Sequence, residues 1–156
     1  MKLAGNNRGA RRLGLVSSAQ DGLHAQLEKQ VRRHLAKRWS QPLHRPTVEV
    51  FERLQDSGVL EGNRPVILDS GCGTGASTQT LADRHPQYLV IGVDRSAVRL
   101  HKSGLHSGLL VDGNHVLARG ELATFWRLAF DAGLKPVRHL LLYPNPWPKS
   151  RHLARR

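Results

Sequence analysis

The sequence predicts an α/β fold in which helices cover a mostly parallel sheet. Short apolar runs alternate with segments of helical periodicity, and a glycine-rich loop follows the first run. The apolar runs also end at polar residues. Strands that alternate with helices form parallel βαβ units with right-handed crossovers. Ligands of such sheets bind beyond the carboxyl ends of the strands, so we expect a site at that edge.

The first part of the chain is expected to lie outside the sheet. Residues 1–16 are rich in glycine, asparagine and arginine and have little to bury, which predicts a flexible basic N-terminus. Residues 17–60 are predicted to form N-terminal helices. A stripe of apolar residues four apart predicts one helix over 19–39, and a second is expected over 46–54. The sheet domain then occupies residues 61–156.

Four strands and three helices are predicted in the sheet domain. The strands are expected at 66–68, 88–93, 109–111 and 139–143. The helices are expected at 76–84, 96–102 and 121–132. Apolar residues at helical spacing predict the core positions of the last helix, which are Leu122, Phe125, Ala129 and Phe130.

The loop after the first strand has the features of a cofactor site. Gly71, Gly73 and Gly75 allow a tight turn and close approach of a ligand to the backbone. The glycine spacing alone fits both a nicotinamide dinucleotide and S-adenosylmethionine. Asp69 favours S-adenosylmethionine, because a carboxylate repels a pyrophosphate but can face the ammonium group of a methionine moiety. Asp94, which ends the second strand, can accept hydrogen bonds from both ribose hydroxyls of either cofactor.

A second motif, Tyr143-Pro144-Asn145-Pro146-Trp147-Pro148-Lys149, follows the fourth strand. The prolines on both sides of Asn145 restrict the backbone and hold this polar side chain beside the cofactor crevice. Trp147 can stack on a base or form a wall of the pocket. The alternative interpretation is a rigid turn in which Trp147 fills the core.

The net charge of +12 is concentrated at the two ends of the chain. Residues 1–40 hold nine basic and two acidic side chains, and residues 146–156 hold four basic side chains and no acid. The stretch between them has a net charge of +1. Such runs are commonly solvated tails or helix faces. Alternatively, the two ends together bind the phosphates of a nucleic acid.

The composition argues against several other classes of protein. The hydrophobic fraction of 39% is enough for a core. We find neither an apolar run of about 18 residues, as a membrane span needs, nor the apolar region of a secretory signal. One Cys excludes an intramolecular disulfide, and no His spacing indicates a metal site. We expect a soluble cytoplasmic protein without a metal.

Together these motifs resemble the bacterial tRNA (guanine-N7)-methyltransferases. The resemblance runs from about residue 60 to the end and rests on 68–75, 91–96 and 143–149 with the arginines that follow. It implies a Rossmann-like class I methyltransferase fold, S-adenosylmethionine as methyl donor and a guanine N7 of tRNA as acceptor. The implied cofactor contacts are Asp69, Gly71, Gly73, Gly75, Asp94, Asp112 and Asn145. Asn145 would also be the catalytic residue, and the substrate contacts would be Trp147, Lys149 and Arg151.

The sequence departs from the family pattern in two ways. The family usually has Asp at the position of Asn145, and it continues beyond Arg156 for three more strands that include a Thr-Asp motif. With a family strand order of 3-2-1-4-5-7-6, this chain supplies only 3-2-1-4. The apolar fourth strand would then be an open edge that favours association. We therefore expect a fragment, a truncated reading frame or a product that needs a partner to cover this edge.

Two alternatives to an active methyltransferase follow. One is a catalytically impaired remnant that still binds RNA or S-adenosylmethionine. The other is a nicotinamide-dependent oxidoreductase, which Asp69, the Asn145 motif and the short chain disfavour.

Overall fold

The computed structural model describes residues 24–37 and 40–142. The chain divides into two compact units, one formed by 1–39 with 146–156 and the other by 40–145. In the first unit, α1 (Leu27–Leu35) lies inside the helix predicted over 19–39. Its apolar stripe is exposed within the described residues, where Leu35 is 83% accessible. No helix in the described ranges has the length and apolar character that a membrane crossing requires.

The second unit is built on a five-stranded sheet with the order β3-β4-β2-β1-β5. β1, β2, β4 and β5 are parallel, and β3 runs antiparallel to β4. The strands are β1 (Val66–Ser70), β2 (Leu89–Asp94), β3 (Leu109–Asp112), β4 (His115–Arg119) and β5 (Arg138–Leu140). The mostly parallel α/β class is confirmed, and the predicted order 3-2-1-4 is that of the four parallel strands.

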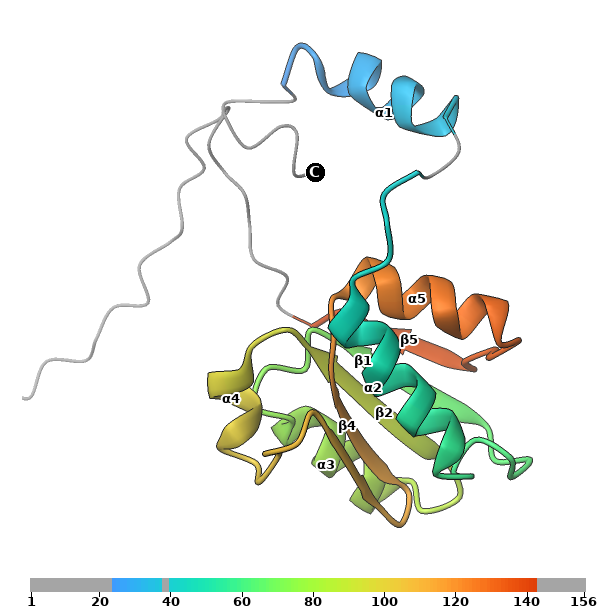
Figure 1. Cartoon of the computed structure of the whole chain (residues 1–156), viewed down its shortest axis with the longest axis vertical. Coiled ribbons are helices and arrows are strands. Elements are labelled where there is room, and N and C mark those ends of the chain that lie inside the picture. The colour runs from blue at the N-terminus through green and yellow to red at the C-terminus, as the bar shows by residue number, and fades with distance from the viewer. Residues whose placement is uncertain (1–23, 38–39, 143–156) are drawn as a thin grey trace, which may run out of the picture. The chain divides into compact units, whose positions relative to one another are not determined.

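Helices cover both faces of this sheet. α2 and α5 lie on one face and α3 and α4 on the other (Figure 1). The helices are α2 (Arg45–Asp56), α3 (Ala76–Arg84), α4 (Ala97–His101) and α5 (Leu122–Asp131). Because side chains alternate along a strand, Leu68 packs toward α2 and α5, and Ile67 packs toward α3.

The core between α2 and α5 fixes the position of α2. Phe51 of α2 meets Phe125 of α5 edge to face, with ring centroids 5.3 Å apart. The buried Thr47 Oγ1 accepts a hydrogen bond of 2.9 Å from the Glu121 N–H, in the turn between β4 and α5. The first turn of α2 is therefore attached to the carboxyl edge of the sheet, where the site is expected.

The third parallel strand is β4 and not the segment predicted at 109–111. That segment forms β3, which pairs with β4 as a hairpin closed by the two-residue turn Gly113-Asn114. Gly113 has a φ of +59°, which this tight turn accommodates without steric cost. The Asp-Gly pair that precedes Asn114 is a hairpin signal, and reading it would have identified β4.

The predicted core positions of α5 are only partly correct. Phe125 and Ala129 are buried, and Leu122 packs against the same cluster. Phe130 was expected in the core, but it is 82% exposed in the described structure. Helical spacing places Phe130 on one side of α5, but burial also requires a neighbouring element to cover that side. β5 is the edge strand beside α5 and carries a single hydrogen-bonded neighbour, β1.

The buried His115 at the start of β4 predicts a loss of stability in acid. Burial lowers its pKa more than the nearby Asp112 and Asp83 raise it, so the pKa lies below the ordinary value. The unfolded chain then binds more protons than the folded one near and below pH ~6.5. The contribution of the neutral His115 side chain to the free energy of unfolding is therefore complete above that pH and is lost as pH falls.

Urea unfolding at about pH 7.5 and about pH 5.5 measures this effect as a difference between the wild type and His115→Leu. We expect the free energy of unfolding to fall more in the wild type. Equal losses in the two proteins would show that His115 does not contribute to the pH dependence.

Candidate active site

The loop between β1 and α3 returns closely on itself at the carboxyl edge of the sheet. Gly71, Gly73 and Gly75 all have φ between +64° and +80°, a region that glycine adopts without strain. The Gly71 N–H donates to the Val93 carbonyl of β2 at 2.7 Å. A Cβ at Gly71 or Gly73 would meet none of the described residues within 4 Å, so in this part of the chain the space above the loop is open to a ligand.

Asp69 joins the end of β1 to the start of α3. Its side chain is fully buried, and Oδ2 accepts hydrogen bonds from the hydroxyls of Ser77 at 2.6 Å and Thr78 at 2.9 Å. Its Oδ1 is buried and has no hydrogen-bond partner among the described residues. A buried carboxylate oxygen without a donor is costly, so this atom can receive an N–H from a ligand or a bridging water.

Asp94 holds the glycine loop from the neighbouring strand. Its Oδ2 accepts from the Gly73 N–H at 2.9 Å, and its Oδ1 accepts from the Ser96 N–H at 2.7 Å. An ionised carboxylate offers about four lone-pair positions, so two positions are left for the hydroxyls of a bound ribose. The side chain is 7% exposed, at the surface of the crevice.

Two glycines are required by close packing around this loop. A Cβ on Gly75 would lie 2.7 Å from Cδ2 of Leu117. A Cβ on Gly92 would lie 2.3 Å from Oγ1 of Thr78, whose hydroxyl donates to Asp69. The loop and α3 can therefore approach β2 and β4 only with glycine at these positions.

Cys72 contributes to packing and does not have the character of a nucleophile. Burial raises the pKa of its thiol to about 12, and the nearby carboxylate of Asp69 adds to this shift. A thiol with such a pKa is almost entirely protonated at neutral pH and reacts slowly.

Asp112 does not belong to the site, which corrects its predicted role as a cofactor contact. It pairs with His115 at the start of β4 and therefore lies at the amino edge of the parallel strands. The prediction assumed that 109–111 runs parallel to the other strands, which would have placed Asp112 at the opposite edge. The carboxyl end of the third parallel strand is Arg119, which is in register with Asp94.

Glu121 follows β4 at this edge and caps α5. Its carboxylate accepts from the N–H groups of Ala123 at 3.0 Å and Thr124 at 2.7 Å. Partial burial raises the pKa of Glu121, but these hydrogen bonds lower it more, so the pKa lies below its ordinary value. The sequence motifs did not identify Arg119 and Glu121, because they depend on finding β4.

Ser70 connects α5 to β5 beside the site. Its hydroxyl oxygen accepts from the Trp126 indole N–H at 2.9 Å and lies 2.8 Å from Nε2 of His139. The rings of Trp126 and His139 meet edge to face, with centroids 5.3 Å apart. This contact holds the strand that leads into the Tyr143 motif.

The second motif lies outside the described residues. Asn145, Trp147, Lys149 and Arg151 therefore keep their predicted roles as proposals. Within the described ranges, no three His, Cys, Asp or Glu side chains gather as a metal ion would require.

A comparison with protein families decides the class to which this arrangement belongs. A family model described as "Putative methyltransferase" matches residues 63–156, more than half of the chain. The chain belongs to this family. The matched region contains the glycine loop, both buried carboxylates and the second motif. The resemblance seen in the sequence is confirmed, and family membership does not support the oxidoreductase alternative.

Curated relatives share part of their length with this chain. Proteins named tRNA (guanine-N(7)-)-methyltransferase include one from Mycobacterium avium (strain 104), which is 41% identical over 98 residues, 59% of this chain and 35% of that protein. A second, from Edwardsiella ictaluri, is 32% identical over 116 residues, which cover 70% of this chain and 46% of that protein. A third, from Thermus thermophilus, is 34% identical over 121 residues, which cover 73% of this chain and 34% of that protein. The chain thus spans between a third and a half of these relatives. No solved structure matches it significantly.

The packing at Gly75 predicts a large cost for a single methyl group. Gly75→Ala combines an unfavourable φ with the contact to Leu117, and we expect it to lower the free energy of unfolding by about 2–4 kcal/mol. The matched control is Gly104→Ala, which has a φ of +82° and open space at the Cβ position. The control should cost only about 1 kcal/mol. Urea unfolding measures the loss of unfolding free energy in each variant. Equal losses in the two variants would contradict the packing argument.

The environment of Cys72 predicts an unreactive thiol. Native protein at about pH 8 should not react with a thiol-specific dye such as Ellman's reagent on the timescale of minutes, whereas the urea-unfolded chain should react at once. Rapid reaction of the native protein would show that the thiol is accessible and ionised.

Proposed function

We propose that the chain supplies the donor-binding part of an enzyme that transfers a methyl group from S-adenosylmethionine to guanine N7 of tRNA. The observation that carries this proposal is the buried Oδ1 of Asp69, which has no hydrogen-bond partner among the residues that the structure describes and lies next to the glycine loop. Family membership and the names of the curated relatives support the reaction class and the RNA acceptor. The donor-binding domain would occupy residues 61–156.

The donor would lie along the carboxyl edge of β1 and β2. Asp69 would accept a hydrogen bond from the ammonium group of the donor's methionine moiety, directly or through water. Asp94 would accept hydrogen bonds from the donor's ribose hydroxyls. The backbone of Gly71 and Gly73 would approach the donor closely, because no side chain of the described ranges lies within 4 Å of their Cβ positions. When bound, S-adenosylmethionine supplies an electrophilic methyl group.

The acceptor needs positioning more than proton transfer. Guanine N7 has an in-plane lone pair and carries no proton, so no general base is required at that atom. Asn145, held between two prolines, would hydrogen-bond the base edge, and Trp147 would stack on the base. Lys149 and Arg151 would contact the phosphates of the tRNA together with the basic ends of the chain. A tRNA-modifying enzyme of this kind would act in the cytoplasm.

Donor binding can be tested by calorimetry with S-adenosylhomocysteine and NAD. We expect binding of S-adenosylhomocysteine only, and Asp94→Asn should weaken it by about tenfold, since an amide accepts fewer hydrogen bonds than a carboxylate. Asp112→Asn is the matched control, because it makes the same change at the opposite edge and should leave affinity unaltered. Binding of NAD instead, or equal effects of the two variants, would overturn the proposed donor site.

The neutral side chain of Asn145 predicts weak methyl transfer. Methylation places positive charge on the guanine, which a carboxylate stabilises better than an amide. Asn145→Asp in the full chain should raise labelled-methyl transfer to tRNA by about tenfold or more, and Asn63→Asp should not change it. No increase would contradict the charge argument. Donor binding without transfer by any of these proteins would favour the impaired remnant.

A further inference from the structure

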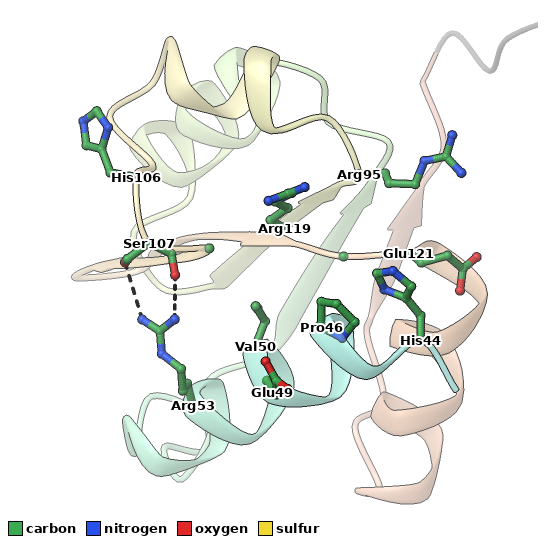
Figure 2. A pocket seen from close by; sticks show the side chains of 12 residues that line it. His44, Pro46, Glu49, Val50, Arg53, Arg95, His106, Ser107, Arg119 and Glu121 are labelled. Atoms are coloured by element: carbon green, nitrogen blue, oxygen red, sulfur yellow. Dashed lines mark hydrogen bonds between the residues drawn. The ribbon is translucent and has the colours of Figure 1, made fainter. Parts of the chain in front are cut away.

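A second feature of the carboxyl edge is a solvent-open cavity of about 730 Å³ between α2, the turn before β3 and the residues that follow β2 and β4 (Figure 2). None of the glycine-loop residues lines it, but Arg95 and Gly120 place it directly beside Asp94 of the proposed donor site. Its charged lining residues are Glu49, Arg53, Arg95, Arg119 and Glu121, and His44 and His106 also line it.

The two carboxylates in this lining are engaged by other groups. Glu121 accepts the backbone N–H groups at the start of α5. Glu49 forms an ion pair of 3.3 Å with Arg45, one turn earlier on α2. Neither carboxylate forms an ion pair with an arginine of the cavity among the described residues, and the three arginines give the lining a formal net charge of +1.

Among the described residues, Arg53 is held in place by neutral acceptors only. Its guanidinium donates to the Ser107 carbonyl at 2.6 Å and to the Ser107 hydroxyl at 3.4 Å, and Figure 2 shows it reaching from α2 to the turn before β3. These bonds orient the planar group without neutralising it. An arginine ordered in this way can bind an oxyanion with less loss of side-chain entropy.

Arg95 and Arg119 extend the positive charge toward the donor site. Arg119 is in register with Asp94 across β4 and β2, and Arg95 directly follows Asp94. The Asp94 carboxylate is bound to two backbone N–H groups, and within the described ranges it forms no ion pair with either arginine. Both arginines are exposed and can be reached by a large ligand.

The charge of this lining selects an anion. Guanidinium groups bind phosphate oxygens in a bidentate way, whereas the sulfonium donor carries positive charge and would be repelled. A cavity of this size accepts a nucleotide-sized group. We propose that the cavity binds backbone phosphates of the RNA substrate through Arg53, Arg95 and Arg119. This inference rests on the proposed function, since it assigns a site for the same RNA.

The test is binding of a labelled tRNA transcript to the full chain in the presence of S-adenosylhomocysteine, followed by fluorescence anisotropy over a range of salt concentrations. The double variant Arg95→Gln/Arg119→Gln should bind about tenfold or more weakly at about 0.1 M salt. Its slope of log K against log salt should be smaller by roughly 1.4–1.8, as expected for two lost phosphate contacts.

The matched control is Arg84→Gln/Arg138→Gln, which removes the same charge from exposed positions outside the cavity. It should leave both the affinity and the salt slope close to those of the wild type. Equal losses in the two double variants, or none in the first, would overturn the proposed phosphate site. Guanosine monophosphate should bind far more weakly than the transcript, and equal affinities would assign the cavity to free nucleotides.

Calorimetry with S-adenosylhomocysteine separates this inference from the proposed function. The Arg95→Gln/Arg119→Gln variant should keep the donor affinity of the wild type within about twofold. A parallel loss of donor affinity would assign the arginines to the donor site and overturn the RNA assignment. If the wild type binds no S-adenosylhomocysteine, the proposed function itself fails.

Discussion

The site depends on one buried carboxylate at the end of β1. Removing Asp69 from water is unfavourable unless donors replace the lost hydration, and the hydroxyls of Ser77 and Thr78 supply donors to only one of its oxygens. This pairing fixes the first turn of α3 against β1 and sets the course of the glycine loop. The close contacts around Gly75 and Gly92 follow from that placement.

The sequence was sufficient for features that depend on local chemistry. The glycine spacing and the acids after two apolar strands predicted the loop, Asp69 and Asp94, because backbone freedom and desolvation act over a few residues. The sequence was not sufficient where the prediction depends on which strands pair with each other. The hairpin of β3 and β4 moved the third strand end from Asp112 to Arg119. The exposed Phe130 likewise shows that periodicity defines a face but not what covers it.

The two kinds of charge are unevenly distributed along one edge of the sheet. Asp69 and Asp94 lie at the ends of β1 and β2, whereas Arg95 follows β2 and Arg119 ends β4, where Glu121 caps α5. A cationic donor and a polyanionic acceptor would need such a distribution, because each would be repelled by the surroundings that suit the other. The reaction proposed here requires the two to meet at one atom, so adjacent sites of opposite charge on one rigid edge would serve both binding and orientation.

One of the two bonds that join Trp126, Ser70 and His139 has a fixed direction. An indole N–H can only donate, so the Ser70 oxygen is the acceptor in that bond, and its single proton is free to point at His139 Nε2. With Nε2 as the acceptor, the ring carries its proton on Nδ1, on the side away from Ser70. In the other tautomer Nε2 donates to Ser70, and the serine proton needs a different acceptor. The attachment of β5 to α5 therefore depends on the tautomer of a single ring.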